Sequence, residues 1–275
     1  MSRHPHVLIF DSGVGGLSVA REILAAYPQC QLTYCSDNAG FPYGSKASDW
    51  LTERVTRVMR KLILTFAPDV IVVACNTAST VTLAELRQAF ATPFVGVVPA
   101  IKPAANISHT KSIGVLATPA TVSRAYTHQL VADYASDCTV FLHGSSNLVV
   151  QAELKLMGRA PDLHIIAQEV GALLDKPGAE AMDTVVLACT HFPLLQEELA
   201  QASVSRQLQW VDSGEAIARR VGFWIGQMPP CEHVCLAPIE VVLTAPSEHW
   251  LALQASMKRY LNVESDPCLT VVDIV

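Results

Sequence analysis

The stretch DVIVVACNTAST at residues 69–80 occurs a second time, in altered form, as DTVVLACTHFPL at residues 183–194. In each copy a run of β-branched and other apolar residues predicts a buried strand, and a cysteine follows six residues after the aspartate. Cys75 and Cys189 therefore stand at equivalent places, at the carboxyl end of a strand and before polar residues that can begin a helix. Two matched thiols indicate two halves with equivalent roles.

Short apolar runs and helical patterns alternate around both copies. In the first half the runs VLIF, LTYCSD, VIVVAC and FVGVV are separated by helices expected to begin near Leu17, Ala47 and Ser79. In the second half IGVLAT, FLH and TVVLAC repeat the rhythm, with the helical segment VSRAYTHQLVADYA between the first two. Strands that alternate with helices predict parallel sheets with helices on both faces. The expected fold is α/β, with two pseudo-symmetric, doubly wound parallel-sheet domains and the active site between them.

The domain boundary is expected near the segment VPAIKPAA at residues 98–105, where two prolines suit a hinge or crossover. After the second cysteine strand, LQWVDSGEAIARRVGFWIG predicts a strand and a helix, with Asp212 and Glu215 at capping-box spacing. The later runs IEVVLT and LTVVDI are expected to return to the first domain. The predicted domains are residues 1–98 plus 211–275, which carry Cys75, and residues 99–210, which carry Cys189.

Composition narrows the class of protein. Of the 275 residues, 51% are hydrophobic and 16% are charged, a balance typical of buried parallel sheets. No apolar run reaches the roughly 18 residues that a spanning helix needs, and the run VLIF is too short for a signal peptide. We therefore expect a cytoplasmic protein without a membrane partner. The net charge of −6 argues against a nucleic-acid partner, because phosphate backbones require a basic face.

Cysteine usage argues against a disulfide scaffold. Eight cysteines in a chain of this length read as reduced thiols; they stand at positions 30, 35, 75, 138, 189, 231, 235 and 268. The segment CEHVC at residues 231–235 places two of them around a histidine, and a metal enzyme is therefore one alternative. A structural zinc site needs four ligands and no second knuckle lies nearby, so we expect a loop and no metal.

The matched thiols suggest a chemistry. A thiol at the carboxyl end of a parallel strand lies where open α/β folds bind ligands, and a helix amino terminus at that place favours the thiolate. With one thiol from each half, a small substrate between them could lose a proton from one face and gain a different proton on the other. That geometry suits inversion of a stereocentre.

Other polar residues accompany the thiols. The stretch FDSGVGG places Asp11 and Ser12 at the end of the first strand, but it lacks both the full GxGxxG and the Walker ending, which disfavours a nucleotide site. Asp11 could orient a thiol or accept its proton. The stretch YCSDNAGFPYGSK places Tyr43 and Gly44 in a turn whose N–H groups and hydroxyl can meet a ligand. His191, two residues after Cys189, could be that thiol's proton partner.

Several strings together resemble the glutamate racemases, cofactor-independent enzymes of the aspartate/glutamate racemase family that supply D-glutamate for peptidoglycan. They are DSGVGGLSV, YCSDNAGFPYG, VVACNTAST, GVVPAIKPA, GVLATPAT and LACTHFPLL, and they span roughly residues 8–195. The resemblance implies that Cys75 acts on D-glutamate and Cys189 on L-glutamate, that Asp11 assists Cys75, and that His191 and Glu153 support Cys189. It implies substrate contacts by Asp11, Ser12, Tyr43, Gly44, Asn76, Thr77, Thr190 and His191.

The resemblance also bears on partners and rivals. It implies glutamate as substrate and no cofactor, and it leaves open a homodimer and activation by a cell-wall precursor. These motifs contain hydroxyls, amides and turn N–H groups but no arginine, so neutral donors are expected to hold the substrate carboxylates. The alternatives are a racemase of a related amino acid such as aspartate, and a gyrase-binding regulatory protein, since some relatives are reported to inhibit DNA gyrase. A pyridoxal-phosphate racemase needs a Schiff-base lysine, and neither Lys102 nor another lysine stands in a recognisable cofactor pocket.

Overall fold

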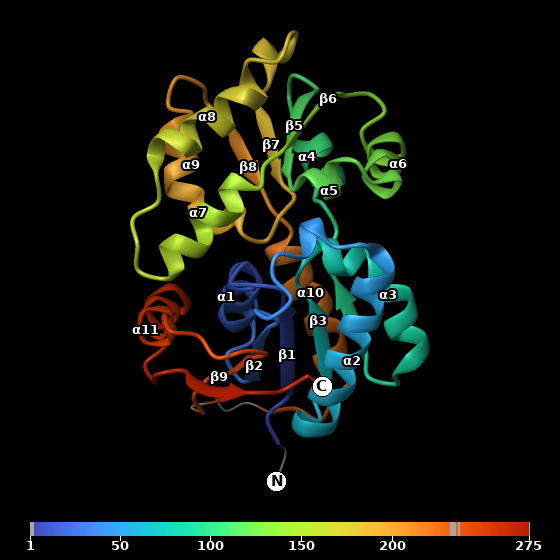
Figure 1. Ribbon diagram of the computed structural model, residues 1–275. Helices are drawn as coiled ribbons and strands as arrows, with labels where there is room; N and C mark the ends of the chain where they lie inside the picture. The colour runs from blue at the N-terminus through green and yellow to red at the C-terminus, as the bar shows by residue number, and fades with distance from the viewer. Residues whose placement is uncertain (1–2, 232–234, 236, 275) are drawn as a thin grey trace. The chain divides into compact units, whose positions relative to one another are not determined.

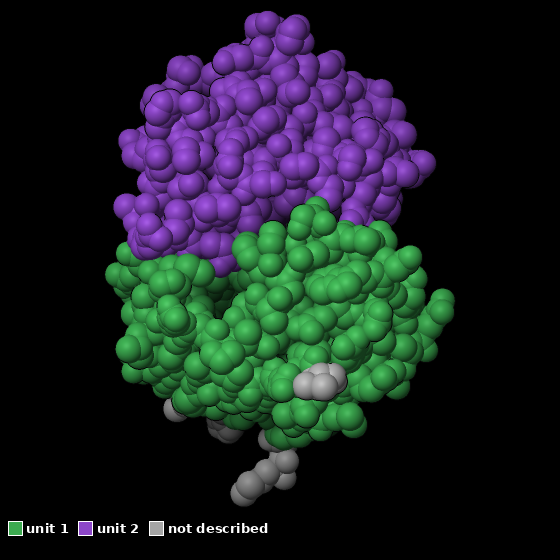
Figure 2. Space-filling view, in the orientation of Figure 1, with its two compact units in different colours: residues 1–97, 156–158, 214–275 green, residues 98–155, 159–213 purple. Residues whose placement is uncertain are grey.

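The computed structural model describes residues 3–231, 235 and 237–274 (Figure 1). The chain divides into two compact units, coloured separately in Figure 2. Unit 1 comprises residues 1–97, 156–158 and 214–275, and unit 2 comprises residues 98–155 and 159–213. Each unit has its own sheet, so each is described by itself.

Unit 1 is built on a six-stranded sheet in the order β10-β9-β2-β1-β3-β4, with every pairing parallel. The central strands β1 and β3 consist entirely of buried residues, as expected for parallel strands covered on both faces. Because β9 pairs with β2, the carboxyl-terminal part of the chain completes the first sheet. The strands are β1 (His6–Asp11), β2 (Gln31–Ser36), β3 (Val70–Val73), β4 (Phe94–Gly96), β9 (Glu240–Leu243) and β10 (Cys268–Val271).

Helices cover both faces of this sheet (Figure 1). On α2, Leu51, Val55, Val58, Met59 and Leu62 recur at spacings of three and four and are fully buried. Burial of each such side chain contributes about 1.5–3 kcal/mol, which holds α2 against the sheet. The helical elements are α1 (Leu17–Ala26), the single 3-10 turn η1 (Tyr43–Ser45), α2 (Ser48–Phe66), α3 (Asn76–Ala89), α10 (Gly214–Ile225) and α11 (Trp250–Leu261).

Unit 2 is built on a four-stranded parallel sheet in the order β6-β5-β7-β8. Ile113 and Val115 of its central strand β5 pack in one apolar cluster with Ile101 and Leu130 from two helices. The strands are β5 (Ser112–Ala117), β6 (Thr139–Gly144), β7 (Thr184–Leu187) and β8 (Gln209–Val211). The helical elements are α4 (Ile101–Ile107), α5 (Pro119–Val122), α6 (Ala125–Tyr134), α7 (Asn147–Leu156), α8 (Leu163–Leu174), η2 (Ala179–Ala181), η3 (Phe192–Leu195) and α9 (Gln196–Ala202).

The two sheets share one strand order, which confirms the predicted fold class. The series β2-β1-β3-β4 in unit 1 corresponds to β6-β5-β7-β8 in unit 2. In both, the chain crosses from the central strand to one neighbour and then returns across it, so the winding direction reverses between β1 and β3 and again between β5 and β7. Open α/β sheets bind ligands at the carboxyl ends of strands at such a reversal. Cys75 follows β3 and Cys189 follows β7, so each thiol lies at the reversal point of its own sheet.

Three local details differ from the sequence-based expectations. Helix α3 begins at Asn76 rather than near Ser79, because Cys75 itself takes the extended backbone of the N-cap position. The segment predicted as a hinge or crossover, residues 98–105, is mostly helix α4. Pro103 is tolerated at its third position because first-turn N–H groups have no intrahelical acceptor. Helix α10 begins at Gly214, two residues after Asp212.

Within residues 3–231, 235 and 237–274, none of the helices combines the length and apolar character needed to cross a membrane.

Candidate active site

In unit 1, Asp11 ends the central strand and is fully buried. Its Oδ1 accepts hydrogen bonds from the Gly13 N–H at 3.0 Å and from the Ser12 hydroxyl at 3.3 Å. A Cβ added at Gly16 would lie 3.0 Å from the Cβ atoms of both Asp11 and Ala74, so glycine is needed for α1 to begin this close to the strands. The glycines of DSGVGG therefore bring the chain close to Asp11.

Cys75 lies beside this loop, at the N-cap of the 14-residue helix α3. Its side chain is largely enclosed, with 7% exposed, and its Sγ is 3.8 Å from the Ser12 Oγ. The amino terminus of a helix carries partial positive charge, which favours an anion over a neutral group. Position and helix dipole together therefore favour a reactive thiolate at Cys75.

Asn76 and Thr77 form the first turn of α3, and both are buried. The Oδ1 of Asn76 has no hydrogen-bond partner among the residues that the structure describes. Leaving a buried acceptor unpaired is costly, and such groups in native proteins call for an explanation. A ligand donor at the end of β3 would satisfy this oxygen.

The turn predicted to contact a ligand is η1. The ring of Tyr43 is buried, and its hydroxyl donates a hydrogen bond to Asp37 Oδ2 at 2.5 Å, so that hydroxyl is already used within unit 1. Burial and the neighbouring Asp37 carboxylate raise the pKa of Tyr43 well above its ordinary value, so the hydroxyl stays protonated. The first N–H groups of a 3-10 turn have no acceptor within the turn, and these are what Tyr43 and Gly44 can offer.

In unit 2, Cys189 and His191 follow β7 directly. The Cys189 thiol is 6% exposed, and its Sγ is 3.8 Å from His191 Nδ1. The other ring nitrogen of His191, Nε2, is 2.7 Å from Glu153 Oε1 on α7. Burial alone would lower the pKa of His191, but its hydrogen bonds with Cys189 and Glu153 outweigh burial and raise that pKa well above the ordinary value. The arrangement therefore favours the charged imidazolium, and the ring lies between a sulfur and a carboxylate.

Helix α7, which carries Glu153, is anchored to its surroundings at several points. The Leu148 N–H bonds Ser145 Oγ at its start, and Gln151 Oε1 accepts from the backbone N–H of Asp162 at 2.7 Å. Near its end, Lys155 Nζ pairs with Glu198 of α9 at 2.8 Å. These contacts fix the rotation of α7 and turn Glu153 inward, where it is buried rather than solvated.

The structure thus assembles the predicted residues in two sets. Unit 1 gathers Asp11, Ser12 and Cys75 at one strand edge, and unit 2 gathers Glu153 and His191 around Cys189. Thr190, between Cys189 and His191, is also buried. Sequence reasoning missed Asp37 and Arg54, whose partly buried ion pair borders the η1 turn. A signal existed, since Arg54 lies three residues after Leu51 on the otherwise apolar face of α2.

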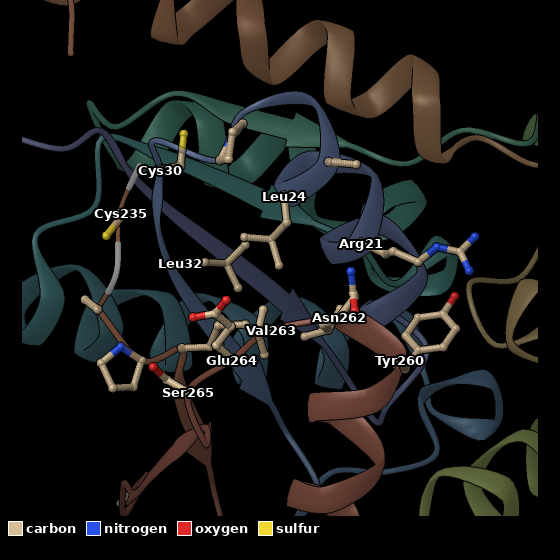
Figure 3. Close-up of a pocket in the computed structure, with 16 residues that line it drawn as sticks. Arg21, Leu24, Cys30, Leu32, Cys235, Tyr260, Asn262, Val263, Glu264 and Ser265 are labelled. Atoms are coloured by element: carbon tan, nitrogen blue, oxygen red, sulfur yellow. The ribbon is translucent and has the colours of Figure 1, made fainter. Parts of the chain in front are cut away.

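A cavity of about 660 Å³ in unit 1 lies elsewhere (Figure 3). Its walls come from α1, the start of β2, the segment before β9 and the end of α11. It therefore opens at the amino ends of β2 and β9, whereas Asp11 and Cys75 lie at the carboxyl ends of their strands. Cys30 and Cys235 line it, and burial, reinforced by Cys235, raises the pKa of Cys30 to about 12. A thiol with that pKa stays protonated and unreactive.

The residues behind the rival hypotheses can also be placed. In CEHVC, Cys231 Sγ is 3.4 Å from His4 Nδ1, but His233 lies outside the described residues. Over residues 3–231, 235 and 237–274, no three His, Cys, Asp or Glu side chains are grouped so as to hold a metal ion. Lys102, considered for a Schiff base, is exposed on α4 with its Nζ 5.2 Å from the centre of the Tyr134 ring.

Comparison with known proteins identifies relatives over most of the chain. The glutamate racemase of Pasteurella multocida is 52% identical over 217 residues, 79% of each protein, and that of Vibrio vulnificus is 46% identical over 257 residues, 94% of each. The crystal structure of Escherichia coli glutamate racemase in complex with L-glutamate and the activator UDP-MurNAc-Ala matches with a TM-score of 0.89 at 40% identity, over 98% of both chains. A Bacillus anthracis glutamate racemase isoform matches with a TM-score of 0.80 at 25% identity, over 98% of both.

A family model agrees with these individual matches. The model described as Asp/Glu/Hydantoin racemase matches residues 16–221, a span that contains both cysteine motifs. The matched span and the relatives agree on one family for this chain, and the strand order and the paired thiols are consistent with it. The chain belongs to the Asp/Glu/Hydantoin racemase family.

Proposed function

We infer that this protein is an amino-acid racemase that interconverts L-glutamate and D-glutamate. The observation that carries this is the pair Cys75 and Cys189, each at the reversal point of an equivalent sheet, in a chain 46–52% identical to proteins named glutamate racemase. The D-glutamate produced serves peptidoglycan precursor synthesis, and hence cell shape, in the cytoplasm. No cofactor is needed, because the two thiols supply the acid and the base.

The proposed reaction uses two bases. With L-glutamate, the Cys189 thiolate removes the α-proton, so an S–H bond forms as the Cα–H bond breaks and the electron pair remains on the carbanion. The Cys75 thiol then gives its own proton to the opposite face of that carbon, which yields D-glutamate and a Cys75 thiolate. The reverse reaction begins at Cys75. Prior positioning of both sulfurs and exclusion of water supply much of the rate.

The neighbours of each thiol have supporting roles. Asp11 accepts a hydrogen bond from the Ser12 hydroxyl, which lies 3.8 Å from Cys75 Sγ, and it assists proton movement at that thiol. His191, held in its charged form by Glu153, donates from Nδ1 to the Cys189 sulfur and stabilises its thiolate. The two thiols differ because Cys75 lies at the amino terminus of α3, whereas Cys189 depends on the His191–Glu153 pair.

Substrate binding is assigned largely to neutral donors, with Asn76 as an acceptor. The N–H groups of Tyr43 and Gly44, together with Thr77 and Thr190, are proposed to hold the substrate carboxylates. The unpaired Oδ1 of Asn76 suits the substrate ammonium group, which can donate to it. Asp11, Ser12 and His191 complete the predicted contacts.

We propose further that a cell-wall precursor activates the enzyme, as UDP-MurNAc-Ala is the activator in the Escherichia coli complex. The 40% identity and full-length match to that protein support the extension. Racemisation measured with and without UDP-MurNAc-Ala tests it, and an unchanged rate would refute it. A homodimer stays a prediction, to be checked by sedimentation velocity.

Circular dichroism time courses on L-glutamate, D-glutamate and L-aspartate, with no added cofactor, test the proposed activity. Both glutamate signals should decay to zero, because the equilibrium mixture is racemic, while the aspartate signal should persist. Decay of aspartate alone would replace the assignment with an aspartate racemase. Loss of activity on treatment with a strong chelator would favour the metal-enzyme alternative.

A further inference from the structure

Arg54 and Asp37 form an ion pair that the proposed chemistry does not use. Asp37 directly follows β2 and its side chain is completely buried, while the Arg54 side chain, on α2, is 16% exposed. The guanidinium donates from Nη2 to Asp37 Oδ1 at 2.7 Å and from Nε to Oδ2 at 3.0 Å. Such a two-point contact fixes both side chains in direction as well as in distance.

Two further donors complete the coordination of the Asp37 carboxylate. The Tyr43 hydroxyl donates to Oδ2 at 2.5 Å, and the Thr244 hydroxyl donates to Oδ1 at 2.5 Å. A carboxylate has about four acceptor positions, and here four donors occupy them. Burial would raise the pKa of Asp37, but hydrogen bonds from Arg54, Thr244 and Tyr43 outweigh burial and lower it. The carboxylate is therefore ionised and held from four sides.

This network determines where the η1 turn lies. A Cβ added at Gly40 would fall 2.6 Å from Asp37 Oδ2 and 2.9 Å from a Tyr43 ring carbon, so the segment from residue 37 to residue 43 is folded tightly on itself. The Tyr43 ring packs in the same apolar cluster as Cys75 and Phe10. The backbone N–H of Asp37 also donates to the carbonyl of Asp11 at 2.9 Å. Movement of the Asp37 side chain would therefore displace the turn.

We propose that Arg54 is a positioning residue for the racemase: by clamping Asp37 it sets the Tyr43–Gly44 turn at the place where its N–H groups hold a substrate carboxylate. This rests on the proposed function. The carboxylate is bound equally in the substrate and in the transition state, so weakening its site removes uniform binding. Loss of uniform binding raises KM and leaves kcat nearly unchanged.

A purely structural role for Arg54 is the competing explanation, because removal of Arg54 leaves a buried carboxylate without its counter-charge and destabilises unit 1. Three variants separate the two. Arg54→Met removes the charge and the fork. Arg54→Lys keeps the charge but not the two-point contact. The double variant Asp37→Asn/Arg54→Met removes both charges, so it relieves the uncompensated charge without restoring the clamp.

The experiment measures kcat and KM for both glutamate enantiomers and the thermal midpoint of each variant. Arg57→Met is the matched control, because Arg57 lies on the same helix in an exposed pair with Glu53 and its side chain is 45% exposed. We expect KM to rise roughly 10- to 100-fold in Arg54→Met for both enantiomers, the size of effect that follows from losing a hydrogen bond to a charged group. The KM of Arg54→Lys should lie between those of the wild type and Arg54→Met, and the KM of the control Arg57→Met should match the wild-type value.

The double variant decides the outcome. If it regains thermal stability while its KM stays high, Arg54 positions the turn. If KM returns to the wild-type value together with stability, or if KM is unchanged in a folded Arg54→Met, the proposal is wrong. If Arg54→Met does not fold, KM and thermal stability of Arg54→Lys and of the double variant are compared with the wild type by the same criteria. A wild-type enzyme that does not racemise glutamate would instead refute the proposed function.

Discussion

Cys75 and Cys189 occupy equivalent places in two copies of one motif, yet their surroundings differ. Cys75 caps a 14-residue helix and lies 3.8 Å from the Ser12 hydroxyl, which donates a hydrogen bond to Asp11, whereas Cys189 is followed by the four-residue turn η3. Where the first copy has a helix dipole, the second has His191 paired with Glu153. The repeated strand places the sulfur, and the element that follows decides how its charge is stabilised.

At Cys75 the groups that stabilise the thiolate are several backbone N–H groups, whereas at Cys189 they are side chains. A helix terminus contributes about 0.3–1 kcal/mol for a nearby anion, spread over several backbone N–H groups that no single side-chain change removes. Hydrogen bonds to charged groups contribute about 1.5–3 kcal/mol, and at Cys189 they depend on one imidazole. The Cys189 side should therefore be more sensitive to single substitutions outside the thiol itself.

The largest loss of activity is expected when either thiol is replaced, because both are needed for the proposed reaction. Cys75→Ser and Cys189→Ser should each lower kcat/KM for racemisation by roughly 10³-fold or more, because a hydroxyl is a far weaker base than a thiolate at neutral pH. Circular dichroism on both enantiomers measures this. Cys138→Ser, at a partly exposed cysteine of unit 2, is the control and should be fully active. Retention of near-normal turnover by either active-site variant would exclude the two-thiol mechanism.

Replacement of the charged partner at Cys189 should come next. His191→Asn should lower kcat/KM by roughly 10²-fold, the usual scale for losing a group that acts in proton transfer. Both directions must fall together, because the equilibrium constant of a racemisation is one. A loss no greater than that of the Ser12 variant described below would mean that the Cys189 thiolate does not depend on His191.

The pH dependence of stability and of kcat/KM should show whether Glu153 raises the pKa of His191. Because its pKa is raised above 6.5 in the folded protein, the stability it contributes is fully present below pH 6.5 and is lost as the pH rises through the folded pKa. Glu153→Gln removes one of the groups that raise this pKa, so the alkaline limb of kcat/KM should move toward lower pH. Activity should fall only about tenfold at neutral pH. An alkaline limb in the same place would show that Glu153 does not set the charge.

The smallest effect is expected at the Cys75 side. Ser12→Ala removes a hydroxyl 3.8 Å from Cys75 Sγ but leaves the helix dipole intact, so kcat/KM should fall only about two- to fivefold. Thr65→Ala, at an exposed hydroxyl on α2, is the control for loss of a helix-bonded hydroxyl. A loss as large as that of His191→Asn would show that Cys75 also depends on a single side chain, and the contrast drawn above would fail.

Much of the fold could be predicted from local pattern. The helices expected near Leu17 and Ala47 begin at Leu17 and Ser48, and the apolar runs around both cysteines form β3 and β7. Local pattern puts the start of α3 three residues late, because the N-cap position is taken by Cys75, which is not a typical capping residue. The two prolines of residues 98–105 indicate a hinge, but Pro103 falls in the first turn of α4, where proline causes no loss of hydrogen bonding.

The sequence alone determined the alternation of strands and helices, the duplication, and the position of each thiol at a strand end, because periodicity and chain polarity are properties of neighbouring residues. Tertiary structure decided which distant groups meet. Glu153 reaches His191 from 38 residues away, and Thr244 reaches Asp37 from 207 residues away. Those contacts depend on the order in which strands enter the sheet and on the rotation of packed helices. No local pattern encodes that order or rotation, so the charge of His191 and the clamp on the η1 turn became visible only in the folded chain.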